Sequence, residues 1–393
     1  MDVQLLTPLI VIILLFVLAT FLQRFSVPPI ITQIIALIGL LATPLNITTF
    51  ELPIWTLEAL LFILLFYVSV QTPPSEFGKE ALRAIPASIA TSIVGIAVGF
   101  SVSHFYLALP LHQSAVIAFI MGAFASASLL TTMERCSLIK TEVAKAGVGI
   151  AIVNNLIALL ALSAVHNSHE IVDVALKSGY ALGWLILAIA TARYIYPRIV
   201  KALNITSTEA TLSALLLQAL FLSFVAHLLG LSFMLGAFVS ALFVKETYLH
   251  GEIHVQIRKS FFALSYLIAL PLLLLSSTQF LKLDLSVALS AIILVVTVGI
   301  AQFIVTYASL WFKHYGRAQS TALASFSFLR SEVAFALALF AVHMSLISAE
   351  TFSLILLALL IATLLSFLSL FIGFSKLKTE EPYRSIIANK GSK

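Results

Sequence analysis

Residues 284–311 read DLSVALSAIILVVTVGIAQFIVTYASLW, and no charged side chain follows Asp284 in this run. A helix that crosses the hydrocarbon core of a bilayer needs about 20 predominantly apolar residues. Similar runs recur along the whole chain of 393 residues, which is 61% hydrophobic and only 10% charged. Soluble domains carry roughly 25% charged residues. The sequence therefore predicts an all-α polytopic membrane protein and excludes a soluble enzyme, a disordered chain, a coiled coil and a nucleic-acid-binding protein.

Apolar runs separated by polar residues or by Pro and Gly predict about thirteen membrane-spanning helices. Residues 1–375 then form one transmembrane unit, and residues 376–393 form a short cytoplasmic tail. The single cysteine, Cys136, excludes a disulfide framework, a CxxC redox pair and a thiolate metal site. The approximate limits of the spans are 4–22, 28–45, 53–70, 84–107, 113–132, 145–165, 178–196, 208–229, 231–245, 260–277, 284–311, 318–343 and 350–374.

The distribution of Lys and Arg predicts how these spans are oriented. When the spans alternate in direction, only Lys177 and Lys282 fall on one side of the membrane, and Arg330 falls inside a span. The rest of the 22 basic residues share the opposite side, and basic residues collect in cytoplasmic loops. We therefore expect the N-terminus outside and the C-terminus inside, in the inner (cytoplasmic) cell membrane. This topology accounts for the net charge of +5, so membrane lipid is expected as a partner and nucleic acid is not.

Two charged residues, Arg330 and Glu332, fall deep inside the span at 318–343. Charges at membrane depth cost several kcal/mol and usually mark function. Residues two apart lie roughly 200° apart around a regular helix, so the two side chains pair only if the helix breaks. A pair would keep Glu332 ionised and make it a poor proton carrier. Arg330 would then be a structural partner, a fixed cation in the site or an anion-binding group.

Neutral polar residues also cluster at membrane depth. The span at 145–165 contains GVGIAIVNNL, with the adjacent amides Asn154 and Asn155. Two such amides are costly in a membrane unless they find hydrogen-bond partners. They indicate either a transport site or hydrogen bonding between helices without transport.

The spans at 113–132 and 318–343 are rich in small and hydroxyl residues at their centres. Such stretches support discontinuous helices whose free backbone groups line a site, although close helix packing favours the same residues. The second stretch lies in the seventh span after the first, so the two run in opposite directions. The pattern predicts inverted repeats with two broken helices that cross. The first stretch, MGAFASASLLTT at 121–132, supplies the candidate site residues Ser126, Ser128 and Thr131.

Several motifs, taken together and in order, resemble the monovalent cation:proton antiporter superfamily. Residues 230–242, GLSFMLGAFVSAL, resemble its GLS-x-x-LGAFLAG span. Arg330-Ser-Glu332-Val-Ala-Phe resembles its RGE-[FV]-A run, and Val27-Pro-Pro and Leu65-Phe-Tyr-Val-Ser69 resemble two further segments. The resemblance covers about residues 5–374 and favours the branch of glutathione-gated potassium-efflux and related sodium/proton antiporters.

This resemblance implies a panel part that dimerises and a core part that moves in an elevator-like manner. By position, the panel would comprise about 1–71 and 208–277, and the core about 84–165 and 284–374. The span at 178–196 would link them. The resemblance also implies Na⁺ or K⁺ and H⁺ as transported ions, a homodimer and no cofactor.

The sequence departs from this family at the Asn154-Asn155 pair. The second position normally carries the Asp that exchanges a cation for a proton, and an amide cannot ionise. Other departures are Gln71 in place of Glu, and Ser69 and Ser331 in place of Gly. If exchange persists, another group must titrate, and Glu332 is the best candidate.

The sequence therefore predicts a secondary antiporter of Na⁺ or K⁺ against H⁺ with an atypical site, and not an enzyme. One alternative is a divergent member that moves another solute or an anion without proton coupling. Another is a membrane subunit that does not transport. The candidate transport residues are Asn154, Asn155, Ser126, Ser128, Thr131, Arg330 and Glu332.

Overall fold

The computed structural model describes nine stretches of the chain, together with six isolated positions. The predicted spans at 4–22 and 28–45 lie outside the described residues, apart from two isolated positions in the first. Within the described part, the regular elements are all helices. The stretches are 52–71, 79–126, 141–166, 171–203, 207–244, 251–282, 284–313, 315–330 and 332–377.

Nine helices or successions of helical segments in the described part are long and apolar enough to cross a membrane. The predicted all-α polytopic fold is therefore confirmed, whereas the total of thirteen spans and their orientation remain predictions. The nine segments are Ile54–Gln71, Leu82–Tyr106, Glu142–Val165, Val172–Ala202, Thr208–Leu228, Val255–Phe280, Leu285–Trp311, Arg317–His343 and Ala349–Leu370.

The chain divides into two compact units. Unit 1 comprises Met1–Gln71 and Leu182–Lys282, and unit 2 comprises Thr72–Ala181 and Leu283–Lys393. One of the three boundaries between them, after Ala181, falls inside helix α8, Ile171–Ala190. Both units are therefore assembled from segments that lie far apart in the sequence.

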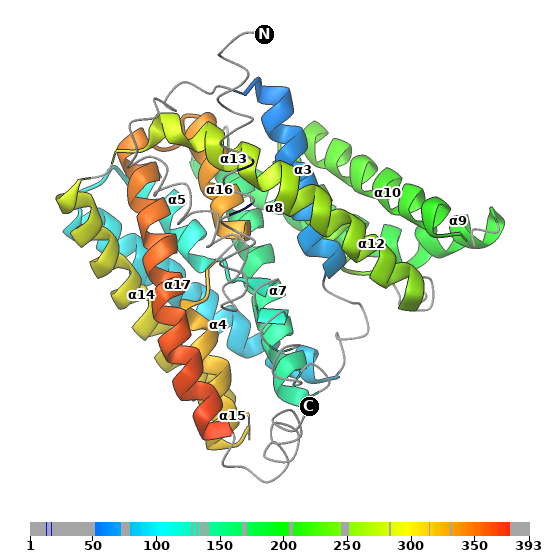
Figure 1. The fold of residues 1–393 in the computed structure, drawn as a ribbon. Coiled ribbons are helices and arrows are strands. Elements are labelled where there is room, and N and C mark those ends of the chain that lie inside the picture. Colours follow the sequence, from blue (N-terminus) through cyan, green and yellow to red (C-terminus); the bar gives the residue numbers. More distant parts are fainter. Residues whose placement is uncertain are drawn as a thin grey trace. The chain divides into compact units, whose positions relative to one another are not determined.

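Unit 1 contains helix α3 and the helical elements from the second half of α8 to η6 (Figure 1). Its helical elements include the π-helical segments η3 and η5 and the 3₁₀ turn η6. Besides the second half of α8, they are α3 (Ile54–Gln71), η3 (Thr191–Ile195), α9 (Tyr196–Ala202), α10 (Thr208–Leu228), α11 (Met234–Val239), α12 (Gly251–Ala263), η5 (Leu264–Ala269), α13 (Leu270–Ser277) and η6 (Thr278–Phe280).

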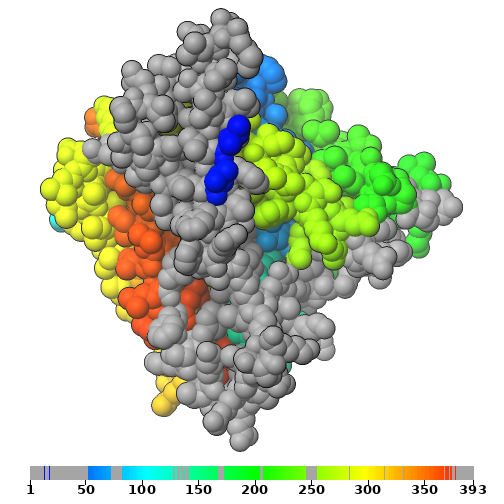
Figure 2. Space-filling model, in the orientation of Figure 1, coloured from blue at the N-terminus to red at the C-terminus, as the bar shows by residue number. Residues whose placement is uncertain are grey.

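Unit 2 is a bundle in which the long helix α14 packs against both α4 and α17 (Figure 1). Parts of α14 and α17 lie at the surface seen in Figure 2. Exposed apolar side chains, such as Ile304 on α14 and Leu368 on α17, suit contact with lipid. Besides the first half of α8, the elements are α4 (Lys79–Ser101), η2 (Val102–Tyr106), α5 (Leu111–Gly122), α7 (Glu142–Val165), α14 (Leu285–Trp311), α15 (Arg317–Ala324), η7 (Ser325–Phe328), α16 (Glu332–His343) and α17 (Ala349–Leu377).

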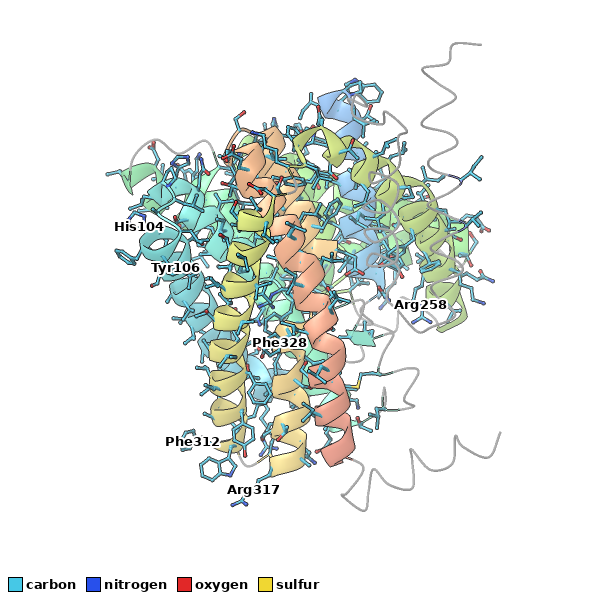
Figure 3. All side chains as sticks on the ribbon, turned by 60° about the vertical axis from the view of Figure 1, so that its left-hand side comes forward. His104, Tyr106, Arg258, Phe312, Arg317 and Phe328 are labelled. Carbon is cyan, nitrogen blue, oxygen red and sulfur yellow. The ribbon has the colours of Figure 1, made fainter. Side chains whose placement is uncertain are left out.

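Two glycines let α14 lie close to its neighbours in unit 2. A Cβ atom at Gly95 of α4 would lie 2.0 Å from Nε2 of Gln302, and one at Gly299 would lie 2.2 Å from the Phe328 ring. The absence of these side chains makes room for Gln302, which is fully buried, and for Phe328, which is half-buried and labelled in Figure 3. Gln302 is thereby brought to the centre of unit 2.

The helix in the GLSFMLGAF motif of unit 1 is shorter than the predicted span at 231–245. Helix α11 ends at Val239, and turns follow as far as Val244. Side chains from two other helices bind the backbone that leaves the helix: Gln218 Nε2 donates to Ser240 O at 3.0 Å, and Ala241 N donates to Ser69 Oγ at 3.0 Å. In a longer helix, Ser240 O and Ala241 N would form hydrogen bonds within the helix. The bonds to Gln218 and Ser69 replace them.

Gly236 of α11 generates a stability prediction, because a Cβ at this position would lie 2.1 Å from the Ser223 backbone nitrogen of α10. We expect Gly236→Ala to lower the free energy of unfolding by about 1–3 kcal/mol through overpacking. Gly183→Ala is the matched control, because its Cβ meets nothing within 4 Å, and we expect less than about 0.5 kcal/mol. Melting of both purified variants in detergent checks this. Equal melting of Gly236→Ala and wild type would contradict the packing described for α10 and α11.

Candidate functional site

The first broken helix begins with α5, which ends at Gly122. Ala123 adopts an extended conformation, with φ −75° and ψ 139°. The chain becomes helical again beyond Ala125, where Leu129 N donates to Ala125 O at 3.1 Å. The break therefore leaves the backbone N–H groups of Phe124 and Ala125 without helical acceptors.

The second broken helix comprises α15, the 3₁₀ turn η7 and α16. Leu329 is extended, with φ −78° and ψ 107°, and α16 begins at Glu332. Arg330 lies in the extended segment, and Glu332 is the first residue of the second half-helix. The predicted interruption of both spans is thus present in the structure.

The two breaks cross and are joined through their backbones. Ala125 N donates a hydrogen bond to Leu329 O at 3.0 Å, although about 200 residues of sequence separate them. A later helix supplies a side chain to each break. Phe124 N donates to Oδ1 of Asn155 on α7 at 2.8 Å, and Thr363 Oγ1 of α17 donates to Arg330 O at 3.2 Å. Each side chain satisfies a backbone group for which the membrane offers no water.

Asn155 is fully buried, and its orientation is determined by a backbone donor. Because Phe124 N–H can only donate, the atom of Asn155 that faces it must be the carbonyl oxygen Oδ1. The amide nitrogen Nδ2 then lies on the other side and donates to Ser126 Oγ at 3.4 Å. A donor therefore occupies the place where a carboxylate would present a second oxygen.

Asn154 is also fully buried, and it contacts α4. Ser92 Oγ donates to Asn154 Oδ1 at 2.5 Å. Its Nδ2 atom has no hydrogen-bond partner among the residues that the structure describes. One half of this amide is therefore satisfied and the other is an unused donor.

Arg330 is 2% exposed and is held by neutral groups. Its Nη1 donates to Ala123 O at 3.2 Å, and its Nη2 donates to Gln302 Oε1. The guanidinium carbon lies 4.7 Å from the centre of the Phe124 ring. Arg330 thus links the second break to the first break and to α14.

Gln302 connects this site to a chain of hydroxyl groups between α4 and α14. Its Nε2 donates to Thr91 O at 3.5 Å. Thr91 Oγ1 lies 2.7 Å from Thr306 Oγ1, which in turn lies 3.5 Å from Ser327 Oγ near the second break. Arg330, Gln302 and these hydroxyl groups therefore form one connected polar network inside an apolar bundle.

Glu332 is 1% exposed, and it is the only carboxylate that is fully buried in the described part of the chain. Its position in the first turn of α16 places it at the positive end of that helix's dipole. Arg330 is likewise the only fully buried basic residue in the described part. The described helices contain no cluster of three His, Cys, Asp or Glu side chains that could hold a metal ion.

The structure brings together five of the residues that the sequence singled out: Ser126, Asn154, Asn155, Arg330 and Glu332 lie at or beside the two breaks. The other two, Ser128 and Thr131, lie outside the described residues. Sequence reasoning missed Ser92, Gln302 and Thr363. A signal for Gln302 existed, because it is the only amide in the otherwise apolar stretch at 284–311.

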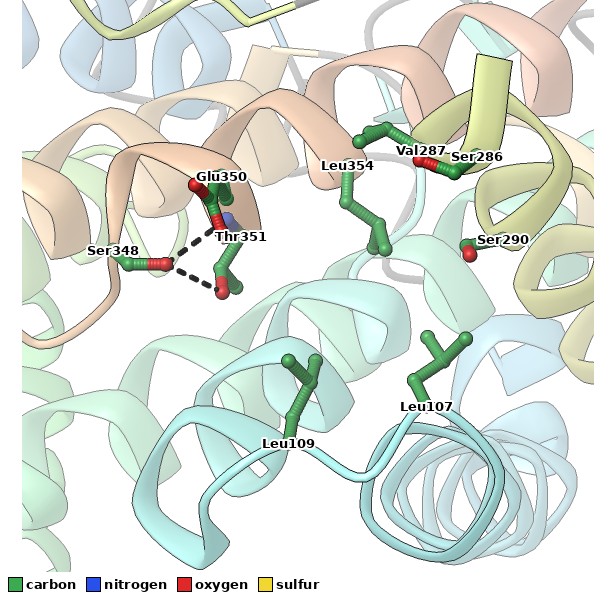
Figure 4. A pocket seen from close by; sticks show the side chains of 9 residues that line it. All are labelled: Leu107, Leu109, Ser286, Val287, Ser290, Ser348, Glu350, Thr351 and Leu354. Carbon is green, nitrogen blue, oxygen red and sulfur yellow. Dashed lines mark hydrogen bonds between the residues drawn. The ribbon is translucent and has the colours of Figure 1, made fainter. Parts of the chain in front are cut away.

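A separate pocket of about 190 Å³ lies in unit 2 where the loop after η2 meets the first turns of α14 and α17 (Figure 4). Leu107 and Leu109 face Leu354 across it. The lining includes the carboxylate of Glu350 and several hydroxyls but none of the predicted site residues. It is therefore distinct from the crossing of the broken helices.

Comparison with solved structures supports the same architecture. The chain is similar to a structure of the sodium proton antiporter MjNhaP1 from Methanocaldococcus jannaschii at pH 8, with a TM-score of 0.72 and 16% sequence identity over 94% of this chain and 97% of that chain. An electron-microscopy map of the same antiporter gives a TM-score of 0.71 and 16% identity over 96% of this chain and 98% of that chain. At this identity, the likeness establishes the fold alone.

Sequence comparison identifies the family directly. No curated protein sequence matches the chain significantly. The family model described as "Sodium/hydrogen exchanger, transmembrane" matches residues 10–374, which is almost the whole chain. The resemblance found in the motifs is thereby confirmed, and the chain belongs to the transmembrane sodium/hydrogen exchanger family.

Proposed function

We propose that this chain is a monovalent cation:proton antiporter that exchanges Na⁺ or K⁺ for H⁺, with Glu332 as the exchanging group. The match to the sodium/hydrogen exchanger family over residues 10–374 is the observation that carries this proposal. The crossing of two broken helices at a buried polar network supports it, because discontinuous helices expose backbone groups to a transported ion. Members of this family are secondary transporters and not enzymes.

The choice of Glu332 follows from the chemistry of antiport. One site must hold either a cation or a proton, so the group that binds them must ionise. Asn155 cannot ionise, and its oxygen already accepts a hydrogen bond from Phe124. Glu332 is a buried carboxylate beside the break. It can supply oxygen ligands to a hard cation or take up a proton instead.

The proposed movement uses the two units. Unit 2 contains both breaks and every described site residue, so we assign it the role of the mobile core. Unit 1 would be the panel that dimerises, and α8 would link the two because one of the boundaries falls inside it. An elevator-like displacement of the core would expose the site alternately to the two sides of the membrane.

A second candidate is a member that moves another solute or an anion without proton coupling. The orientation of Asn155 favours it, because its amide nitrogen presents a donor where a cation requires an acceptor. Transport measurements on wild type and on variants of Asn155 and Glu332 separate the two candidates.

The first test removes the ionisable group. In proteoliposomes with a pH-sensitive dye inside, Glu332→Gln should reduce proton movement driven by Na⁺ or K⁺ to the level of empty liposomes. Glu350→Gln, which alters an exposed carboxylate of α17, should retain it. Proton-coupled flux in a folded Glu332→Gln protein at the wild-type rate would overturn the assignment of Glu332.

The second test restores a carboxylate at the pair of amides. In Asn155→Asp, one oxygen keeps the hydrogen bond from Phe124 and the other replaces the amide nitrogen. We expect a lower KM for the cation and a changed pH profile of exchange. Asn155→Ala should instead lower the free energy of unfolding by about 1–3 kcal/mol without changing the pH profile, because it leaves Phe124 N–H unsatisfied. If exchange has the same pH profile in both variants, the transported cation does not bind at Asn155.

A further inference from the structure

The positive charge of Arg330 has no ionic partner in the part of the chain that the structure describes. Both terminal nitrogens donate to neutral oxygens, those of Ala123 and Gln302. The third nitrogen, Nε, is buried and has no hydrogen-bond partner among the described residues. Arg330 forms no ion pair with a described carboxylate, Glu332 included, although the two are only two residues apart. The side chain is nevertheless 98% buried, since its exposed fraction is 2%.

A buried charge without a counter-charge is unstable in an apolar interior. Removing one partner from a buried ion pair costs about 3–5 kcal/mol, because the remaining charge is left uncompensated. Carbonyl oxygens accept hydrogen bonds from the guanidinium, and the Phe124 ring attracts its positive charge. None of these groups carries a net negative charge. The site therefore calls for an anion close to the guanidinium.

The amide pair provides a second and independent indication. Asn154 is fully buried, and its Nδ2 has no partner among the described residues. Asn155 must direct its Nδ2 away from Phe124 N–H, because its oxygen is bound there. Phe124 also connects the two features, since its N–H binds Asn155 while its ring lies 4.7 Å from the guanidinium. Asn155, the neighbour of Asn154, is thus linked to Arg330 through Phe124, and the two unused donors, Asn154 Nδ2 and Arg330 Nε, suit the binding of an anion.

We propose that the crossing of the broken helices in unit 2 binds a small inorganic anion of halide size, chloride in the cell, as the counter-ion of Arg330. The guanidinium Nε and the amide nitrogen of Asn154 supply its hydrogen bonds. A halide fits this role because it accepts hydrogen bonds from several directions and needs little space.

The bound anion also has a consequence for exchange, and this consequence rests on the proposed function. With the anion in place, the charge of Arg330 is neutralised, so Arg330 no longer opposes the binding of a cation at the proposed exchange site.

Equilibrium binding of radioactive chloride to the purified full-length protein tests the proposal without any transport step. Wild type should bind chloride saturably, and bromide but not gluconate should displace it at constant Na⁺ concentration and ionic strength. Arg330→Gln should lose this binding, whereas Arg330→Lys should retain it with lower affinity. Arg317→Gln, which alters an exposed arginine at the start of α15, is the matched control and should bind like wild type.

Melting of the same proteins gives a second readout. The apparent melting temperature of wild type should rise with chloride until the site is saturated, and that of Arg330→Gln should not respond. Absence of saturable chloride binding to wild type would overturn the proposal, even if Arg330→Gln fails to fold. Equal binding by Arg330→Gln and wild type would also overturn it. Because no flux is measured, neither result depends on whether the protein exchanges cations for protons.

Discussion

The crossing of two interrupted helices is the constraint on which the rest of unit 2 depends. Inside a membrane, the backbone groups released by a helix break find no water, and each group left unsatisfied costs several kcal/mol. In this protein the breaks satisfy each other through the bond from Ala125 N to Leu329 O. Asn155, Arg330 and Thr363 bind three of the remaining groups. Polar residues of the proposed transport site thus also allow the helices to be interrupted.

This dual role explains how the chain forms the first break without the Asp that the family resemblance implies at position 155. An amide oxygen and a carboxylate oxygen can both accept the hydrogen bond from Phe124, so Asn155 maintains the first break. What changes is the net charge of the site. The described core retains one buried carboxylate and one buried guanidinium, and the guanidinium is held by neutral partners. Under the proposed function, exchange of a cation for a proton then depends on Glu332, and the proposed anion neutralises Arg330.

The sequence predicted the features that depend on local composition. Long apolar runs indicated a polytopic helical fold, the small and hydroxyl residues around 121–132 and 324–332 indicated the two breaks, and the depth of Arg330 and Glu332 in a span indicated their burial. The features it missed depend on contacts across the fold. Gln302 reaches Thr91 only because Gly95 leaves room for it, and 211 positions separate the two residues in the chain. The neutral partners of Arg330 could not be predicted either, because they require the two breaks to be placed side by side.

In the proposed function, a cation and a proton compete for one buried carboxylate in unit 2, that of Glu332. Equilibrium affinity for Na⁺ and for K⁺, measured on the purified wild-type protein across a range of pH, tests it most directly. If the ions compete, the affinity for the transported cation falls about tenfold for each unit of pH below the pKa of the carboxylate, because each step must displace a proton. A cation affinity that stays constant across the same pH range would contradict the account.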